Sequence, residues 1–502
     1  MSKLKHLLSK ETNLYLTIIF HPLALPPAGD ISPQGQESTI FPFGGGWGRN
    51  KILNLIVSPY LLCITFVPII AFGQSDFYSK QKVRDDLTYL QSKLIDQHPN
   101  IHIYTSKEKF SDFFENIAIQ DSLTELEVYN LITTSNEIIK DGHTLFYPNK
   151  KWKENNNLNG LFIPIQPFWD GSKLYLSKNY SLSDELQIGV EIVSINGIES
   201  SELIQGMLKK MMNDGNNLNY STWVINTFFY EYFSYFYGCR EEYLIKIDNG
   251  ELEKDLIVKG IAKPELFKNI SNQEKGRDKG IYLEIDKAKS IGILTIKDWH
   301  KDVLRSYYKQ KFIPEIKKAI NSIESGNIQN LIIDVRNNQG GELKYSKYLL
   351  SYLLSEPFVL VEQYYKKKKG KIVECNGPQS GTHQPMSRNF KGNVYVLING
   401  GSFSNTGIFS SVLRKHQRAI FIGEETGGSE FVLCGSQKKI TLPNTGVEIE
   451  LPRLQFIIKS KEDREFNSII PDYYIKPKIE YIVEQKDKDL KFAFELINNS
   501  TP

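Results

Sequence analysis

The spacing of hydrophobic positions changes twice along the chain, and each change predicts a different kind of structure. Between residue 78 and about residue 148, apolar residues recur three or four positions apart, which predicts helices. The residues that set this spacing in the first helix are Val83, Leu87, Leu90 and Leu94. Ser122-Leu-Thr-Glu125 has the pattern of a capping box for a second helix, which Gly142 would end. We therefore expect a helical region that ends just before His143.

Residues 158 to about 262 predict a small β-rich module. Short apolar runs at Leu161–Pro167 and Lys173–Leu176 indicate strands, and Gly189–Gly197 indicates a strand that ends in an Asn-Gly turn. The segment Trp223–Tyr237 is dense in aromatic residues. Such a cluster is typical of a core or of a face between domains, and the other interpretation is a wall that contacts a bound peptide.

From about residue 280, buried strands alternate with helices, which predicts a layered α/β domain. The predicted strands are Ile291–Ile296, Leu331–Val335, Phe358–Gln363, Val394–Ile398 and Ala419–Gly423. The predicted helices cover Phe312–Ile323 and Leu343–Leu354, and a third begins near Ser404. The fold class is therefore α+β and multidomain.

Composition and charge narrow the function classes. The chain has 502 residues, 40% of them hydrophobic and 24% charged, as in ordinary globular proteins. A net charge of +3 is too small to indicate nucleic acid as a partner. The four cysteines form no CxxC pair, and the eight histidines include no HExxH motif. We therefore expect no disulfide framework, no metal site and no cofactor.

The first 73 residues resemble a leader. Arg49-Asn50-Lys51 precedes an apolar stretch from Ile52 to Phe72, which ends in the small-residue pattern Ala71-Phe72-Gly73. This pattern predicts a signal peptide that is cleaved before Gln74, and so a periplasmic or secreted protein. The alternative is a membrane anchor, which the length permits although Ser58, Pro59 and Pro68 interrupt the stretch. Membrane contact would then occur only through an uncleaved leader.

Ser404 is the first candidate for chemistry. Val394–Phe409 predicts a buried strand, a glycine-containing turn and a helix that begins at Ser404. A hydroxyl at a helix start lies beside unpaired backbone N–H groups, which can hold a developing oxyanion. The alternative is that Ser404 only caps the helix, since serine is a favoured N-cap residue.

Three further segments carry candidate groups, each with an ordinary alternative. Asp334–Gly341 follows a buried strand, and its glycine pair lets the backbone approach a ligand. The alternative is a polar loop in which Arg336 pairs with Asp334 or a neighbour. His143 follows a helix, where a histidine is often an ordinary surface residue. Glu465–Asp472 contains a Pro-Asp turn in which Asp472 is the natural local acceptor.

The order of these segments resembles the tail-specific and C-terminal-processing serine peptidases. The shared pattern is Asp-Gly-His, then Asp-x-Arg-x-Asn-x-Gly-Gly after a strand, then Ser-Phe-Ser, Gly423–Gly428 and Pro-Asp. The resemblance implies a PDZ-like module at residues 155–262 and a ClpP/crotonase-like catalytic domain at 275–485, after a helical domain at 74–150. It also implies a peptide or protein substrate.

The resemblance assigns roles to individual residues. Bacterial and chloroplast members use a lysine base where this chain has Ser429. The chain is therefore more similar to the tricorn-type branch, which implies Ser404 as nucleophile, His143 as general base and Glu465 as the supporting acid. A histidine base suits catalysis near neutral pH, and a carboxylate can orient its ring. The oxyanion donors implied are the Asn405 N–H and the backbone of Gly340 and Gly341.

Two other function classes remain open at this point. A catalytically inactive peptide- or ligand-binding protein of the same fold would explain the missing lysine, although His143, Ser404 and the glycine pair argue against it. A non-peptide hydrolase such as an esterase is the other, and it lacks support because Ser404 is not in a Gly-x-Ser-x-Gly motif. Cleavage specificity and oligomeric state are not predicted.

Overall fold

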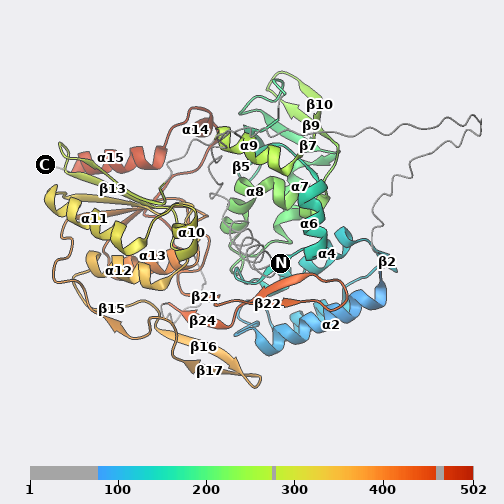
Figure 1. The fold of residues 1–502 in the computed structure, drawn as a ribbon, viewed down its shortest axis with the longest axis horizontal. Helices are drawn as coiled ribbons and strands as arrows, with labels where there is room; N and C mark the ends of the chain where they lie inside the picture. The colour runs from blue at the N-terminus through green and yellow to red at the C-terminus, as the bar shows by residue number, and fades with distance from the viewer. Residues whose placement is uncertain (1–76, 182, 274–278, 459–467, 501–502) are drawn as a thin grey trace, which may run out of the picture.

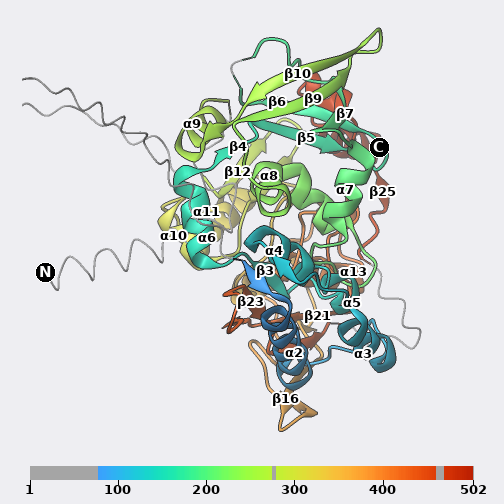
Figure 2. The same cartoon turned by 90° about the vertical axis from the view of Figure 1, so that its right-hand side faces the viewer.

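The computed structural model describes residues 77–181, 183–273, 279–458 and 468–500. The predicted leader with its cleavage before Gln74, and the candidate acid Glu465, lie outside these residues. The described chain is a mixed helix-and-sheet, multidomain structure (Figure 1). Its N-terminal half lies beside the C-terminal α/β layers in two views at right angles (Figures 1 and 2).

The N-terminal region is mainly helical, as the spacing predicts. Its elements are β1 (Tyr78–Ser79), α2 (Lys80–Gln97), α3 (Lys107–Asn116), β2 (Ser122–Leu123), α4 (Glu125–Thr133), α5 (Asn136–Ile139) and β3 (Leu145–Tyr147). Val83, Leu87, Leu90 and Leu94 are all buried on α2. The predicted capping box is displaced by two residues: Thr124 caps α4 and pairs with Glu127. Ser122 cannot cap the helix because it pairs with Ser79 between β1 and β2.

The middle region contains a β-sheet of order β10-β9-β7-β6-β5, with β8 paired to β7. The Asn196-Gly197 turn joins β7 to β8 as predicted, and both turn residues have positive φ. The elements of this region are α6 (Lys150–Asn159), β4 (Leu161–Phe162), β5 (Ile165–Trp169), β6 (Leu174–Asn179), β7 (Glu191–Ile195), β8 (Ile198–Glu199), α7 (Ser200–Leu208), α8 (Asn219–Tyr237), β9 (Glu242–Asp248), β10 (Glu253–Lys259), β11 (Ile261–Ala262) and α9 (Lys263–Gln273).

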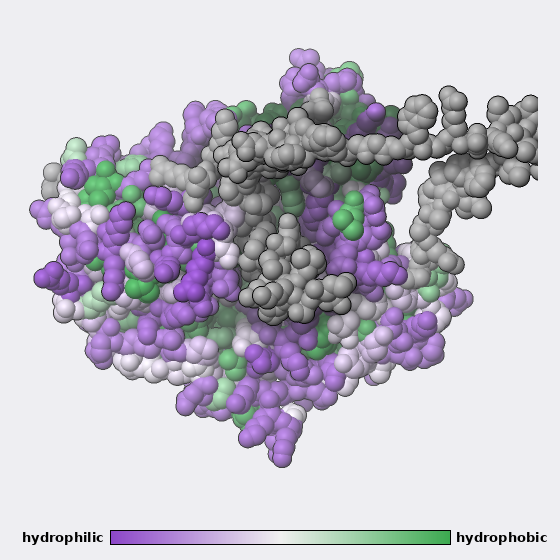
Figure 3. All heavy atoms as spheres, in the orientation of Figure 1, coloured by the Kyte–Doolittle hydropathy of each residue, from purple (hydrophilic) through white to green (hydrophobic). Residues whose placement is uncertain are grey.

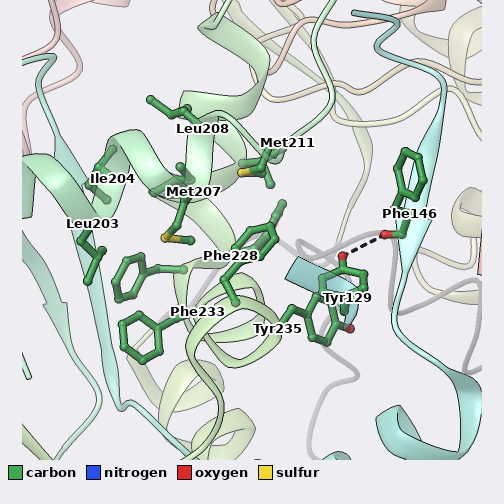
Figure 4. Packing of buried hydrophobic residues seen from close by; sticks show 14 of the residues in the cluster. Tyr129, Phe146, Leu203, Ile204, Met207, Leu208, Met211, Phe228, Phe233 and Tyr235 are labelled. Carbon is green, nitrogen blue, oxygen red and sulfur yellow. Dashed lines mark hydrogen bonds between the residues drawn. The ribbon is translucent and has the colours of Figure 1, made fainter. Parts of the chain in front are cut away.

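The aromatic-rich segment forms helix α8, and its rings are part of the core. Phe228 and Phe233 are buried near Met207 of α7 (Figure 4), and Phe229 belongs to the same buried cluster. The Tyr129 hydroxyl of α4 donates to the Phe146 carbonyl of β3 at 3.1 Å in the same cluster (Figure 4). The core interpretation of the aromatic segment is confirmed.

The C-terminal half is built on a six-stranded sheet of order β12-β13-β14-β19-β20-β25. Strands β13, β14, β19, β20 and β25 are parallel, and β12 is antiparallel to β13. Leu331 and Ile333 of β14 pack with α11, α12 and α13 on one face, whereas Ile332 packs with α15 on the other. The predicted alternation of strands and helices is therefore a sheet between two helical layers.

The bounds of the C-terminal elements follow. They are β12 (Ile281–Asp286), β13 (Ile291–Ile296), α10 (Lys301–Ser306), α11 (Phe312–Ser325), β14 (Asn330–Asp334), α12 (Leu343–Leu353), β15 (Phe358–Val359), β16 (Gln363–Lys368), β17 (Lys371–Cys375), β18 (Thr382–His383), β19 (Asn393–Ile398), α13 (Asn405–Lys415), β20 (Ile420–Gly423), β21 (Val432–Gly435), β22 (Lys438–Thr441), β23 (Glu448–Leu451), β24 (Leu454–Ile457), β25 (Tyr473–Tyr474), α14 (Ile479–Val483) and α15 (Lys488–Ser500).

Strand pairing joins the two halves next to His143. Strand β3 pairs antiparallel with β23, so the loop that carries His143 is hydrogen-bonded to the C-terminal half. Asp86 of α2, which is fully buried, accepts hydrogen bonds from the amides and side chains of Asn444 and Thr445 in the β22–β23 turn. The N-terminal region therefore holds the β22–β23 hairpin at two places, through strand β3 and through Asp86 of helix α2.

The surface is mainly polar on the face shown in Figure 3, where hydrophobic residues occur in small scattered groups. Within the described residues, none of the helices combines the length and the apolar composition that crossing a bilayer requires.

Candidate active site

Ser404 lies in the turn between β19 and α13, with a strained backbone. Its φ of 54° and ψ of −120° put a non-glycine residue in a rarely populated region, which costs about 1–3 kcal/mol. Within the described structure its hydroxyl makes no capping hydrogen bond to α13, so the interpretation of Ser404 as only an N-cap is not supported. The strained turn directs the side chain away from the helix.

The hydroxyl of Ser404 meets His143. Nε2 of His143 lies 3.0 Å from Oγ of Ser404, although 261 positions separate the two residues in the sequence. His143 follows α5 at the end of the helical region and is only 5% exposed, so it is not an ordinary surface residue. Its ring stacks on Phe403, with the ring centroids 4.7 Å apart, and Phe403 stacks in turn on Tyr220 of α8.

Burial keeps the His143 imidazole neutral. Desolvation lowers the pKa of His143 to about 4, against an opposing effect of the Asp141 carboxylate. A neutral imidazole has a free lone pair on one nitrogen and can accept the proton of a hydroxyl. The pair of Ser404 and His143 therefore has the geometry and the protonation state of a nucleophile with its base at neutral pH.

Asp141 fixes the loop that carries His143. Its Oδ2 lies 2.9 Å from Nε2 of His98 and accepts from the Thr144 hydroxyl at 2.7 Å, while Oδ1 accepts from the His143 amide at 3.4 Å. Burial raises the pKa of Asp141, but the hydrogen bond and charge of His98 outweigh that effect and the pKa lies below its usual value. Asp141 is therefore a charged group whose two oxygens are both engaged.

The glycine pair approaches Ser404 closely, as the sequence predicts. Gly340 has a φ of 105°, and a Cβ on it would lie 2.7 Å from Cβ of Ser404, so only glycine fits there. Its own N–H donates to Oδ1 of Asn338 at 3.0 Å, which ties that donor into the loop. Asn405 is the first residue of α13, where backbone N–H groups lack partners within the helix. The backbone around Gly341 and Asn405 is thus the better candidate for an oxyanion site.

Arg336 in the same loop has a structural role. It forms ion pairs with Asp334 at 2.8 Å and with Asp487 and Asp489, which precede and begin the last helix. The alternative interpretation of this arginine, pairing with Asp334, is confirmed. The Pro-Asp turn is also structural, because Oδ2 of Asp472 accepts from the Phe421 amide at 2.7 Å and so holds β25 against β20.

Ser429, where the resemblance described above implies a lysine in other members, is a buried turn residue. Its hydroxyl accepts from the amides of Phe431 and Val432 at 3.1 and 3.3 Å. A Cβ on the preceding Gly428 would lie 3.2 Å from the Asp214 carboxylate. The space around Ser429 is thus occupied by a turn and by Asp214 from another part of the chain.

Asp214 is a site residue that the sequence pattern did not reveal. It lies between α7 and α8, is 2% exposed, and its Oδ1 accepts from the Gly142 amide at 2.8 Å. One ring nitrogen of His143 and one carboxylate oxygen each of Asp141 and Asp214 lie within 4.8 Å of one another. In the sequence, Asp214-Gly215 has only the signature of a turn.

Among the residues that the structure describes, two groups of three side chains have donor atoms close enough for a metal ion. They are His98, Asp141 and Cys434, and Asp141, His143 and Asp214. Both groups need Asp141, whose oxygens already accept hydrogen bonds from His98, Thr144 and His143. The expectation that the site works without metal or cofactor stays a prediction.

Comparison with known proteins finds a family that matches part of the C-terminal half. Residues 290–475 match the model of peptidase family S41. This part of the chain is similar to that family. The matched residues contain the glycine pair, Ser404 and Ser429, whereas His143 and Asp214 lie outside them, in the N-terminal half.

The curated proteins that the chain resembles carry the names of peptidases. The chain is 25% identical over 168 residues to the tail-specific protease of Haemophilus influenzae, a match that covers 33% of this chain and 22% of the relative. It is 24% identical over 165 residues to the chloroplastic carboxyl-terminal-processing peptidase 3 of Arabidopsis thaliana, covering 33% of this chain and 29% of the relative. The chain thus spans less than a third of the length of these relatives.

Solved structures resemble the fold over more of the chain. A crystal structure of mature CPAF superposes with a TM-score of 0.60 at 15% identity, covering 84% of this chain and 98% of that one. At this identity the likeness concerns the fold alone. It extends the similarity from the family region to most of the described chain.

Proposed function

We propose that this chain is a serine peptidase that hydrolyses peptide bonds through an acyl-enzyme on Ser404. The observation that carries the proposal is the 3.0 Å contact between Oγ of Ser404 and Nε2 of His143 at a strained strand-to-helix turn. The names of the curated relatives support the same reaction class. They do not favour a catalytically inactive binding protein.

The proposed reaction starts when Nε2 of His143 takes the proton of the Ser404 hydroxyl. Oγ then bonds to the scissile carbonyl carbon, and the carbonyl oxygen becomes an oxyanion held by backbone N–H groups near Asn405 and the glycine pair. The tetrahedral intermediate collapses, and the leaving amine departs with the proton from His143. Water repeats the sequence on the acyl-enzyme, which releases the acid and restores Ser404.

We also propose roles for Glu465 and for two regions of the chain. Glu465 would support His143, residues 155–262 would form a PDZ-like module that captures a chain terminus, and residues 275–485 would form a ClpP/crotonase-like domain. The sheet of β5–β10 with its two helices is compatible with such a module. The leader pattern at residues 49–73 supports an extracytoplasmic protein.

Labelling with a fluorophosphonate, followed by mass spectrometry of the modified peptide, tests the nucleophile. We expect label on Ser404 in the wild-type chain and none in Ser404→Ala, which should also lose all peptidase activity on unfolded casein. Ser402→Ala is the matched control: its hydroxyl donates to the Val335 carbonyl at 2.9 Å in the same turn, so this variant should lose stability but keep the label. Full activity of Ser404→Ala would rule out the proposed mechanism.

The base assignment has its own comparison. We expect His143→Ala to lower the labelling rate by about 10²–10⁴-fold, the usual contribution of a general base. Lys415→Ala, in which the lost lysine pairs with Glu362 at the surface, should label at the wild-type rate. An inactive lysine variant in the last 100 residues together with an active His143→Ala would show that the base is a lysine.

A further inference from the structure

The two buried atoms without partners in the site belong to His143 and Asp214. Nε2 of His143 contacts Ser404, but Nδ1 has no hydrogen-bond partner among the described residues. Oδ1 of Asp214 accepts from the Gly142 amide, and Oδ2 is likewise without a partner in the described chain. A buried polar atom without a partner costs about 1–3 kcal/mol, so two such atoms on neighbouring side chains of one site call for an explanation.

Asp141 does not supply that explanation. It is the other carboxylate within 4.8 Å of the His143 ring, but both of its oxygens already accept hydrogen bonds. Asp214 is held through Oδ1 by the residue directly before His143, which fixes the carboxylate relative to the ring. Asp214 is therefore the carboxylate near the His143 ring that still has an oxygen, Oδ2, without a hydrogen-bond partner among the described residues.

We propose that Asp214 is the positioning residue of the general base: its Oδ2 accepts the Nδ1–H of His143, directly after a small rotation of the ring or through one water molecule. This inference rests on the proposed function. With the proton held on Nδ1, Nε2 is the free acceptor for the Ser404 proton. The carboxylate also stabilises the imidazolium that forms when that proton arrives.

The charge of Asp214 gives this role a pH signature. Burial, together with the nearby Asp141 carboxylate, raises the pKa of Asp214 to about 7, whereas the pKa of His143 is lowered to about 4. The backbone N–H groups of Gly142 and Ser429 oppose the rise in the Asp214 pKa only in part. Activity should therefore fall below about pH 7 because Asp214 gains a proton, although His143 itself is still neutral there. The other titratable groups that interact with this pair in the described structure are Asp141, Tyr104, Tyr220 and Cys434.

Asp214→Asn separates this role from simple packing. The Gly142 N–H requires an acceptor, so the amide oxygen of the substituted side chain takes the place of Oδ1 and its NH₂ group faces His143. A donor there forces Nδ1 to accept, moves the ring proton to Nε2, and removes the acceptor for the Ser404 proton. The fold keeps its hydrogen bond while the base is in the wrong tautomer.

The test measures fluorophosphonate labelling of Ser404 against pH in the wild type and in Asp214→Asn. We expect the variant to label about 10²–10⁴-fold more slowly at pH 8 and to lose the acid limb near pH 7. The control Asn213→Ala removes a hydrogen bond to Ser221 in the same loop, so it should lower stability but keep the limb. Glu465→Gln is measured in parallel, because Glu465 is the other candidate for the group that supports His143.

The outcomes separate this inference from the proposed function. No wild-type label on Ser404 would mean that the proposed function fails. If the wild type is labelled but Asp214→Asn keeps the wild-type rate and pH profile, the role of Asp214 is wrong and the proposed function stands. The same conclusion follows if the fall in labelling rate near pH 7 is changed only in Glu465→Gln. If Asp214→Asn does not fold, ¹⁵N-histidine spectra of the wild type decide instead: an Nδ1–H tautomer whose signal shifts near pH 7 supports the role, and an Nε2–H tautomer at all pH values overturns it.

Discussion

At the scale of single residues, the candidate site concentrates features that reduce stability. Ser404 has a strained backbone, the imidazole of His143 is buried, and Asp214 holds a carboxyl group with one oxygen that has no partner among the described residues. Each costs free energy that the surrounding structure must supply. Such features together are typical of a functional site, where chemistry rather than stability sets the residue types.

Asp214 should make the folded state less stable as the pH rises. Its pKa is raised from 3.8 to about 7 in the folded protein, so the folded state retains a proton that the unfolded chain loses above about pH 4. The contribution of Asp214 to the free energy of unfolding is therefore fully present below pH 4. It is lost as the pH rises towards 7, by on the order of 4 kcal/mol in total. We expect Asp214→Asn to be more stable than the wild type at pH 8, with a smaller difference at pH 5. Chemical unfolding at the two pH values measures this, and a variant that is less stable at pH 8 would contradict it.

Candidate site residues could be named from the sequence only where a recognisable sequence motif surrounds them. Ser404 and the glycine pair follow buried strands, and the family resemblance of the Asp-Gly-His order pointed to His143, so these residues could be named as candidates whose roles stay predictions. Asp214 could not, because its partner Gly142 lies 72 positions away and its own Asp-Gly signature is that of a turn. The proposed role of Glu465 stays a prediction.

At the scale of elements, the parallel strands were predicted with nearly correct bounds because they are buried on both faces and appear as continuous apolar runs. Strands β13 and β19 match their predicted ranges to within a residue. The three-residue strand β3 was missed, since a segment so short has no detectable period. Its pairing with β23 nevertheless determines where the His143 loop lies.

The anchor of that hairpin on helix α2 can be tested. Asp86→Ala leaves the donors of Asn444 and Thr445 without their buried acceptor, and we expect it to cost at least the ~1.5–3 kcal/mol of one hydrogen bond to a charged group. Labelling of Ser404 should also slow, because the β22–β23 hairpin pairs with β3 beside His143. The adjacent Asp85→Ala, at an exposed position, should change stability by less than about 0.5 kcal/mol. Equal effects of the two variants in denaturant unfolding would contradict this role of Asp86.

At the scale of the whole molecule, the site depends on how two hydrophobic cores meet. One core contains the N-terminal helices and the β5–β10 sheet, and the other contains the helices on one face of the C-terminal sheet. Phe403 belongs to the first core, although its neighbours along the chain, Ile398 and Ile408, belong to the second. The residue before the candidate nucleophile is thus inserted into the half that supplies the base.

This crossing predicts that Phe403 aligns the two halves. Phe403→Leu removes the ring that stacks on both His143 and Tyr220, whereas Phe409→Leu removes a ring that packs on Trp299 within the second core. Each variant should lose about 0.5–1.5 kcal/mol per aromatic pair. At a temperature where both variants are fully folded, only Phe403→Leu should also slow fluorophosphonate labelling of Ser404. A misplacement of about 1 Å between nucleophile and base can lower the reaction rate on the order of 10²-fold. Equal labelling rates in the two variants would mean that the alignment of His143 with Ser404 is set by the β3–β23 pairing alone.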